Sequence, residues 1–370
     1  MAKRFRPTGE DSFYGDTLCE MVVPQKHFLR QLRNLLDWEE FTRPLLQVYK
    51  GEAEVGGVPY HPSVLFRMLL VSYLYNLSER QVEEYVNDSL AAKYFLGLGV
   101  HQQAPDHSSL TVFKERILAK KGTRGFEEMF QRVVRLAGEK GIEFGKIQIV
   151  DATHSVADVN VRKDDQRGGG GGQRRDPDAG WVVKGRKRVR TTEGGSRQVL
   201  KKFYGYKTHM SVNAQSEIVT SIVVTAGNRY DGHQLGSLLS KDKEVGVEAS
   251  IYAGDKGYDD GDNHEMLRSQ GKHSALCLNE YRTRKYPEGL WVETKASAEY
   301  EAGLRERYKI EQKNAEAKRR HGLDRCRYVG RKRYALQAFM TGIVLNLKRM
   351  VKLITGVGLH GRVAVQPLQG

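Results

Sequence analysis

The stretch KIQIVDAT, residues 146–153, places apolar and β-branched residues directly before an aspartate at position 151. This composition predicts a buried strand that ends at Asp151. A second run, SIYAGDKGY at residues 250–258, predicts another strand that ends at Asp255. A carboxylate at the end of a buried strand is costly unless it is paired or binds a cation. In a mixed α/β sheet, groups just beyond the strand ends converge at one edge, where ligands and metals usually bind.

The chain around these two runs has the pattern of an α/β domain. Residues 201–227 predict two strands joined by a polar turn, and HSALCL at residues 273–278 predicts one more strand. Helices are predicted after Asp231, over residues 262–272, and over most of residues 296–353. The predicted fold class is therefore α/β, a mixed sheet flanked by helices.

The N-terminal third has apolar residues at helical spacing instead. It predicts an amphipathic helix after Pro24 and a buried helix with Pro62 in its first turn. Ser78 and Gln81 form a capping box, and Asp106 is expected to cap a later helix. Consecutive short helices permit a helix-turn-helix or a plain bundle, and we favour the bundle. The predicted organisation is a helical domain (1–125), an α/β domain (126–350) with a flexible glycine-rich loop (163–180), and a C-terminal tail (351–370).

The net charge is +15, from 60 Lys and Arg against 45 Asp and Glu, and it predicts a polyanionic partner. Two segments carry this charge: residues 301–352 hold 15 basic residues against 5 acidic ones, and residues 181–210 hold 9 against 1. A focused positive field is what a phosphate-binding groove needs. A basic surface without a nucleic-acid role is the alternative, because net charge governs association and not chemistry.

A third carboxylate follows from helix geometry in residues 305–323, RERYKIEQKNAEAKRRHGL. Arg307 precedes Glu311 by four positions and Lys318 follows it by seven, so the three share one stripe of a helix. This stripe could present Glu311 to a metal ion and place a cation on either side for phosphates. An ordinary surface ion-pair ladder is the alternative interpretation of the same spacing.

Three carboxylates suit the cleavage or transfer of a phosphodiester. The nucleic-acid backbone is already anionic, so a nucleophile must approach negative charge. Two Mg²⁺ ions about 3.5–4 Å apart lower the pKa of an attacking hydroxyl and stabilise the leaving oxygen. Magnesium takes oxygen ligands and keeps several waters, so a few carboxylates suffice. We therefore predict Asp151, Asp255 and Glu311 as catalytic metal ligands for two Mg²⁺ or Mn²⁺ ions. The predicted DNA-binding residues are Arg307, Lys318, Lys256, Lys207, Arg319 and Arg320.

These segments resemble the DDE transposases of bacterial insertion sequences, specifically the insertion-sequence-five group. The matching elements are PDHSSLTVFKERI (105–117), VDATHSVADVN (150–160), the strand pair with its following helix (204–235), DKGYDD (255–260) and the Arg307, Glu311, Lys318 spacing. Their combination in this order is specific, whereas any single piece is weak. The wider superfamily has a Tyr three residues before the Arg, and here that position is Leu304.

The resemblance implies an RNase H-like catalytic core and a helical N-terminal domain that recognises DNA ends and supports subunit assembly. It implies binding to terminal inverted repeats and to target DNA, strand cleavage and strand transfer, and a homo-oligomer on DNA. A stand-alone Mg²⁺-dependent endonuclease and a catalytically inactive DNA-binding regulator are the alternatives.

The sequence also favours a cytoplasmic, prokaryotic protein that associates with the nucleoid and not with a membrane. The start, MAKRFRPTGEDSF, lacks the apolar stretch of a secretory signal, and the apolar run near Val64 to Leu77 is short for a membrane span. The three cysteines, Cys19, Cys277 and Cys326, lie far apart and have neither zinc-site nor disulfide spacing.

Overall fold

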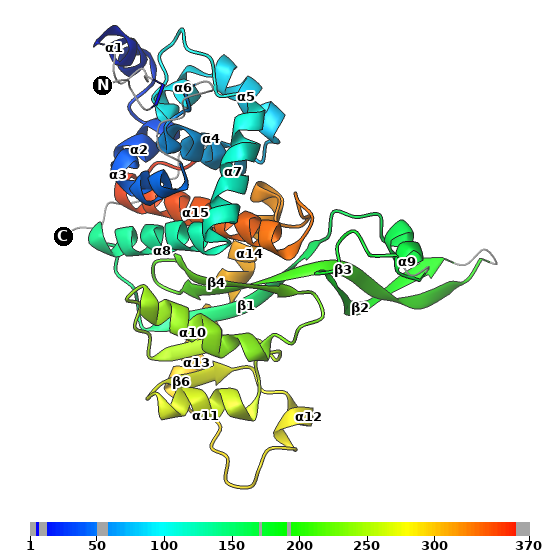
Figure 1. The fold of residues 1–370 in the computed structure, drawn as a ribbon. Coiled ribbons are helices and arrows are strands. Elements are labelled where there is room, and N and C mark those ends of the chain that lie inside the picture. The colour runs from blue at the N-terminus through cyan, green and yellow to red at the C-terminus, as the bar shows by residue number, and fades with distance from the viewer. Residues whose placement is uncertain (1–4, 7–12, 50–57, 170–171, 191–193, 360–370) are drawn as a thin grey trace. The chain divides into compact units, whose positions relative to one another are not determined.

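The computed structural model describes residues 5–6, 13–49, 58–169, 172–190 and 194–359. The chain forms two compact units, one of residues 143–339 and one of residues 1–142 with 340–370 (Figure 1). The predicted limit at residue 125 differs from the unit limit at residue 142, because α8 (Arg124–Glu139) packs with α7 (His107–Lys121). The predicted limit at residue 350 falls inside the helix α15 (Arg331–Thr355), which belongs to both units.

The described part of the N-terminal unit is helical, as predicted. Before α7 it contains α1 (Phe13–Val22), α2 (Phe28–Asn34), α3 (Trp38–Thr42), the 3₁₀ helix η2 (Arg43–Val48), α4 (Pro62–Leu74), α5 (Glu79–Asp88) and α6 (Leu90–Leu96). Every residue of α4 is buried, which fits a helix that is apolar on most faces. The capping box of Ser78 with Gln81 and the cap of α7 by Asp106 are both confirmed. No helix among the described residues combines the length and the apolar character needed to cross a bilayer.

The described part of the second unit is built on a six-stranded mixed sheet. Its strands are β1 (Ile147–Val156), β2 (Gly180–Arg190), β3 (Ser196–Asn213), β4 (Val219–Ala226), β5 (Ile251–Gly254) and β6 (His273–Leu276). The order is β2-β3-β1-β5-β6, and β4 also pairs with β3. β1 is antiparallel to β3 and parallel to β5, so it joins the two halves of the sheet.

Helices cover both faces of this sheet (Figure 1). Tyr252 of β5 packs with residues of α10 (Leu235–Glu244) and α11 (Gly261–Ser269). Its neighbours Ile251 and Ala253 point to the other face and pack with Tyr300 of α13 (Ala298–Glu306). α14 (Tyr308–His321) contacts β1. The predicted α/β class, with a mixed sheet flanked by helices, is confirmed. The remaining short helices are α9 (Val161–Gly169), η3 (Gly232–Gln234) and α12 (Glu280–Thr283).

Two local predictions were wrong. β1 does not end at Asp151, because residues 151–156 continue to pair with β3 after the pairing with β5 has stopped at Val150. The glycine-rich loop predicted over residues 163–180 begins as the helix α9, whose first turn is supported by Asn160. The Asn160 carbonyl accepts from the Asp164 amide at 2.9 Å, and its Oδ1 accepts from the Lys163 amide at 3.3 Å. Residues 170–171 lie outside the described residues.

Asp242 of α10 is fully buried against the sheet. Its carboxylate accepts hydrogen bonds from Ser211 Oγ at 2.8 Å and from Thr220 Oγ1 at 2.6 Å. Burial disfavours the charged form and raises the pKa of Asp242 to about 6, although these hydrogen bonds act in the opposite direction. The folded protein therefore holds this proton more tightly than the unfolded chain does.

The stability of the fold should depend on the protonation of Asp242. The stabilising contribution is fully present below the unfolded pKa of about 4 and is lost as the pH rises through 6. Relative to Asp242→Asn, whose side chain does not titrate, the wild-type free energy of unfolding should fall by about 2 kcal/mol between pH 4 and pH 7. Chemical denaturation at several pH values measures this difference. Parallel pH profiles for the two proteins would contradict the prediction.

Candidate active site

Asp151 and Asp255 lie side by side, directly after the paired stretch of the neighbouring parallel strands β1 and β5. The pairing of β1 with β5 stops at Val150 and Gly254, and each aspartate directly follows its paired residue. Neighbouring strands in a sheet are about 4.8 Å apart, so the backbones at the two aspartates are close. Both aspartates are partly buried. The geometry therefore places the backbones of the two aspartates that the strand pattern singled out side by side.

Asp255 opens a tight turn in which Gly257 leaves room for the carboxylate. The Gly257 amide donates to Asp255 Oδ1 at 2.8 Å, and the Tyr258 amide donates to the Asp255 carbonyl at 3.0 Å. A Cβ at position 257 would lie 2.9 Å from Asp255 Oδ1 and 3.6 Å from Asp231 Oδ2. A side chain at this position would thus displace the Asp255 carboxylate. The same distances show that Asp231 lies beside this turn, although the sequence indicated it only as a helix cap.

Helix α14 brings a residue that the sequence analysis missed against the first aspartate. Asn314 Nδ2 donates to Asp151 Oδ2 at 2.7 Å, and Asn314 Oδ1 is buried without a hydrogen-bond partner in the described part of the chain. Glu311 lies one helical turn earlier and is exposed, with its carboxylate 2.7 Å from Arg307 Nη2. Asn314 occupies the stripe that holds Arg307, Glu311 and Lys318, so the spacing that pointed to Glu311 could also have found it.

Tyr258 lies close to Asp151 and Asp255. Its side chain is fully buried, and its hydroxyl has no partner among the residues that the structure describes. Burial raises the pKa of Tyr258 well above its ordinary value, and the negative charges of Asp151, Asp231 and Asp255 raise it further. The hydroxyl therefore stays protonated and can donate a hydrogen bond near the carboxylates.

Two family models match the sequence, and one of them covers the unit that contains Asp151 and Asp255. The family model described as "Transposase DDE domain" matches residues 143–347, more than half of the chain, and the one described as "Transposase domain (DUF772)" matches residues 18–116. The chain belongs to the DDE transposase family. It is a transposase of the insertion-sequence type with a mixed α/β core, and its assignment to the insertion-sequence-five group and to the RNase H-like class stays a prediction.

Two solved structures resemble this transposase weakly. One is the cryo-EM structure of the piggyBac transposase synaptic complex with hairpin DNA, at 10% identity over 92% of this chain and 75% of that chain, with a TM-score of 0.40. The other is the crystal structure of the Mos1 mariner paired end complex with Mn, at 12% identity over 75% and 86%, with a TM-score of 0.16. At these TM-scores the family assignment rests on the family models.

Asp151, Asp255 and Glu311 do not bring their ligand atoms within 4.8 Å of one another in the transposase. In the described part of the chain, two other groups reach that separation: Glu83 with Asp106 and His107, and His273 with Glu293 and Glu299. Hydrogen bonds account for both of these groups. Glu83 accepts from the backbone and the ring of His107, each at 2.8 Å. Glu293 accepts from the Ser274 amide and from the His273 ring, each at 2.7 Å.

Lys207, predicted to contact DNA, is instead bound inside the transposase. Its ammonium donates to the Arg229 carbonyl at 2.8 Å and to Asp231 Oδ1 at 2.7 Å, and its side chain is 8% exposed. His209, two residues further along β3, is buried, with Nε2 at 2.9 Å from Thr225 Oγ1 and Nδ1 at 3.8 Å from Asp231 Oδ1. Burial, and secondarily Lys207, lowers the pKa of His209 to about 3, so the ring is neutral. Asp231 thus pairs with Lys207, and its side chain does not cap the following helix.

The other predicted DNA-binding residues differ in how much they are exposed. Lys256, directly after Asp255, is exposed, and so are Arg319 and Arg320 near the end of α14. Arg307 and Lys318 are half-buried on the stripe that includes Glu311. Their contact with DNA stays a prediction.

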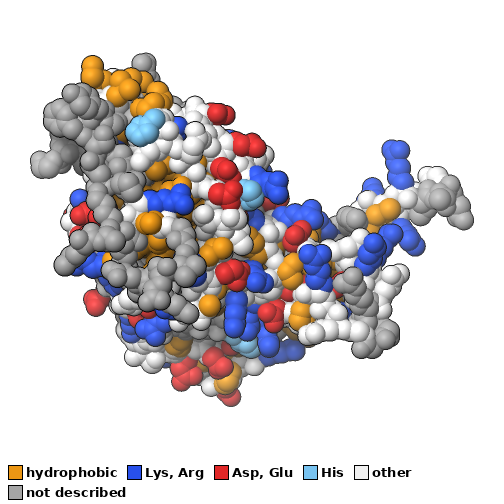
Figure 2. Space-filling model, turned by 45° about the horizontal axis from the view of Figure 1, so that its top comes forward, with side chains coloured by type: hydrophobic (Ala, Val, Ile, Leu, Met, Phe, Trp, Pro, Cys, Tyr) orange, Lys and Arg blue, Asp and Glu red, His pale blue; other side chains and the backbone are white. Residues whose placement is uncertain are grey.

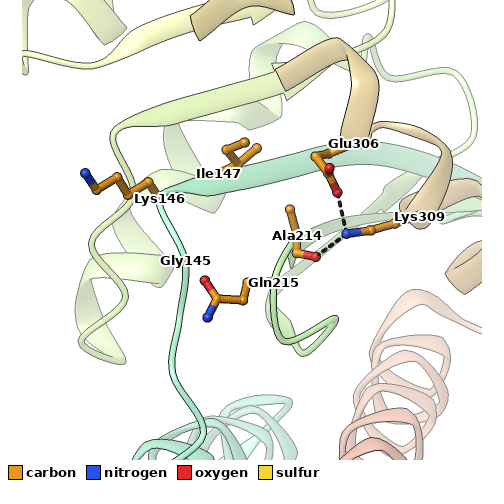
Figure 3. A pocket seen from close by; sticks show the side chains of 7 residues that line it. All are labelled: Gly145, Lys146, Ile147, Ala214, Gln215, Glu306 and Lys309. Carbon is orange, nitrogen blue, oxygen red and sulfur yellow. Dashed lines mark hydrogen bonds and ion pairs between the residues drawn. The ribbon is translucent and has the colours of Figure 1, made fainter. Parts of the chain in front are cut away.

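A pocket in the second unit lies away from these carboxylates, at the start of β1 (Figure 3). Glu306 and Lys309 form an ion pair in its wall, and Lys309 Nζ also donates to the Ala214 carbonyl at 2.8 Å (Figure 3). Ile147 lines the pocket and lies four residues before Asp151, which is about 13 Å along a strand. The pocket is therefore separate from the candidate active site.

Proposed function

We propose that this transposase binds the terminal inverted repeats of an insertion sequence and catalyses DNA strand cleavage and strand transfer at Asp151, Asp255 and Glu311. One observation carries the proposal: two aspartates lie directly after the point where the parallel pairing of β1 with β5 stops, and the helix that bears Glu311 packs against the first of them. Target DNA is the second DNA partner. A homo-oligomer assembled on DNA, with the N-terminal helical domain recognising DNA ends, completes the proposal.

The side chains at this edge fit a divalent cation. Carboxylate and amide oxygens are the donors that Mg²⁺ and Mn²⁺ take. Asn314 Oδ1 is a buried acceptor without a partner among the described residues, next to Asp151, and such atoms call for a ligand or a water. Asp151, Asp255 and Glu311 would hold the metal, with two ions expected. Bound metal supplies activation of the attacking hydroxyl and stabilisation of the leaving oxygen.

The remaining contributions come from the protein's own side chains. Glu311 would exchange its partner Arg307 for metal, and an exposed ion pair is worth about 1 kcal/mol or less, so the exchange is easy. Arg307, once released, and Lys318 on the same stripe would meet phosphate oxygens. Asn314 would hold the Asp151 carboxylate in one orientation. We infer that the protein works in the cytoplasm of a prokaryote, at the nucleoid, because its proposed substrate is the DNA of an insertion sequence.

Strand transfer from a pre-cleaved repeat end into a target plasmid tests the proposed function. The wild type should join the end to the plasmid in Mg²⁺ or Mn²⁺, and a chelator should stop the reaction. Hydrolysis without joining would favour the stand-alone endonuclease. Repeat binding without any metal-dependent nicking would favour the inactive regulator.

The variant Asn314→Ala tests whether Asn314 orients the Asp151 carboxylate. Loss of a residue that orients a metal ligand typically lowers metal affinity or activity by 10–100-fold, so we expect a drop of about that size in strand transfer. The concentration of Mg²⁺ needed for half-maximal rate should rise in parallel. Gln312→Ala is the matched control, because Gln312 is exposed on the same helix. Equal activity of the two variants would remove Asn314 from the site.

A further inference from the structure

β2 and the first part of β3 form a two-stranded arm. Its Cα pairs run from Val183 with Lys202 to Arg190 with Ser196, and along this length β3 pairs with β2 alone among the described strands. Only from Gly205 onward does β3 also pair with β1. Figure 1 shows the arm projecting beyond the rest of the sheet; residues 191–193, between β2 and β3 in the sequence, lie outside the described residues.

The arm buries little of its own surface. Trp181, Val183 and Leu200 are 40%, 54% and 48% exposed. An isolated two-stranded ribbon is only marginally stable in water, so this ribbon depends on the sheet behind it. Charged residues on such strands also prevent edge-to-edge aggregation, which is the simplest explanation for them.

One face of the arm nevertheless carries more positive charge than protection against edge-to-edge aggregation requires. Alternation along β2 places Arg186, Arg188 and Arg190 on the same face, opposite Leu200, Gln198 and Ser196 of β3. All three arginines are exposed and form no hydrogen bond or ion pair with the described residues. Like charges at this spacing repel one another, which a bound polyanion would relieve. Figure 2 shows Lys and Arg side chains gathered along the arm.

We propose that this arm is a duplex-DNA-binding ribbon, whose arginine face (Arg186, Arg188 and Arg190) lies in a major groove of the DNA bound by the transposase. The major groove, about 12 Å wide, admits a two-stranded ribbon. The planar guanidinium groups match phosphate oxygens in bidentate geometry. Gln198 and Ser196, on the same face, offer hydrogen-bonding groups to base edges. The inference rests on the proposed function for its substrate, and it adds a contact away from the carboxylates.

The test compares two double variants of the full chain that remove the same charge from opposite faces of the arm. R186Q/R188Q changes the arginine face, and R197Q/K201Q changes the other face, where both residues are exposed. The probe is a labelled mixed-sequence duplex of about 40 base pairs, four helical turns. Binding is measured over a range of salt concentrations, because each neutralised phosphate contributes about 0.9 to the logarithmic salt slope.

R186Q/R188Q should reduce the magnitude of the salt slope by about two and weaken binding by about tenfold at physiological salt. R197Q/K201Q should leave the slope nearly unchanged. Equal losses in both variants would reduce the arm to a general source of positive field and overturn the proposal. No loss of DNA binding in either variant would also overturn the proposal. Protection against edge-to-edge aggregation, or binding of a protein partner, would then explain the arginine face. Equal melting temperatures for both variants and the wild type show that folding is intact.

The same variants separate this inference from the proposed function. R197Q/K201Q should join pre-cleaved ends at the wild-type rate, because its carboxylates and its arginine face are both unchanged. Failure of the arm inference would leave strand transfer by the wild type intact. If the wild type joins no ends but R186Q/R188Q still lowers the salt slope, the arm binds DNA and the catalytic proposal fails.

Discussion

Replacing Asp255 with Asn should lower the rates of strand cleavage and strand transfer by about a thousandfold or more. Metal-based charge stabilisation is worth several kcal/mol, and each 1.36 kcal/mol corresponds to a factor of ten. The substitution keeps the size of the side chain and removes its charge. Asn also retains an oxygen that can accept the Gly257 amide, now bound to Asp255 Oδ1 at 2.8 Å, so the turn should persist. The expected loss is therefore chemical and not structural.

Two measurements make this test specific. Single-turnover joining at saturating DNA reports the chemical step, and a separate titration should show that DNA binding is nearly intact. Asp262→Asn is the matched control, because Asp262 is an exposed acid at the start of α11 and its loss removes the same charge. That control should react at the wild-type rate. If Asp255→Asn keeps more than about a tenth of the activity, the carboxylate is not a metal ligand.

The positions of Asp151 and Asp255 could be predicted because the signal is local. Each follows a short apolar run, and parallel neighbours in one sheet place such positions side by side. The N-terminal helices were predictable for the same reason, since apolar spacing and caps such as Ser78 and Asp106 are short-range features. The roles of these regions in binding and catalysis stay predictions.

Other features depend on contacts that the sequence does not show. The strand β2 was missed because Lys and Arg alternate with few apolar residues along it, so it has no core-facing pattern. The helix α9 was missed because glycine normally disfavours helices, and its start depends on Asn160. Asn314 was missed because amides on a basic helix usually face solvent, and only the packing of α14 on β1 brings it to Asp151.

Lys207→Met should lower the free energy of unfolding by about 2–3 kcal/mol. Removing one partner of a buried ion pair costs about 3–5 kcal/mol, because the other charge stays buried without compensation. Here the Asp231 side chain is 24% exposed, so water can partly replace the lost ammonium and the penalty is smaller. The double variant K207M/D231N should recover most of the loss, since the remaining amide carries no charge.

The salt dependence of DNA binding distinguishes this internal role from the DNA contact that the sequence predicted. A lysine that neutralises a phosphate contributes about one unit to the logarithmic salt slope, so its loss would reduce the slope by that amount. Because the Lys207 ammonium is bound to Asp231 and to the Arg229 carbonyl, K207M/D231N should keep the wild-type slope. A slope reduced by about one at an unchanged melting temperature would contradict the internal pair and return Lys207 to the DNA-binding surface.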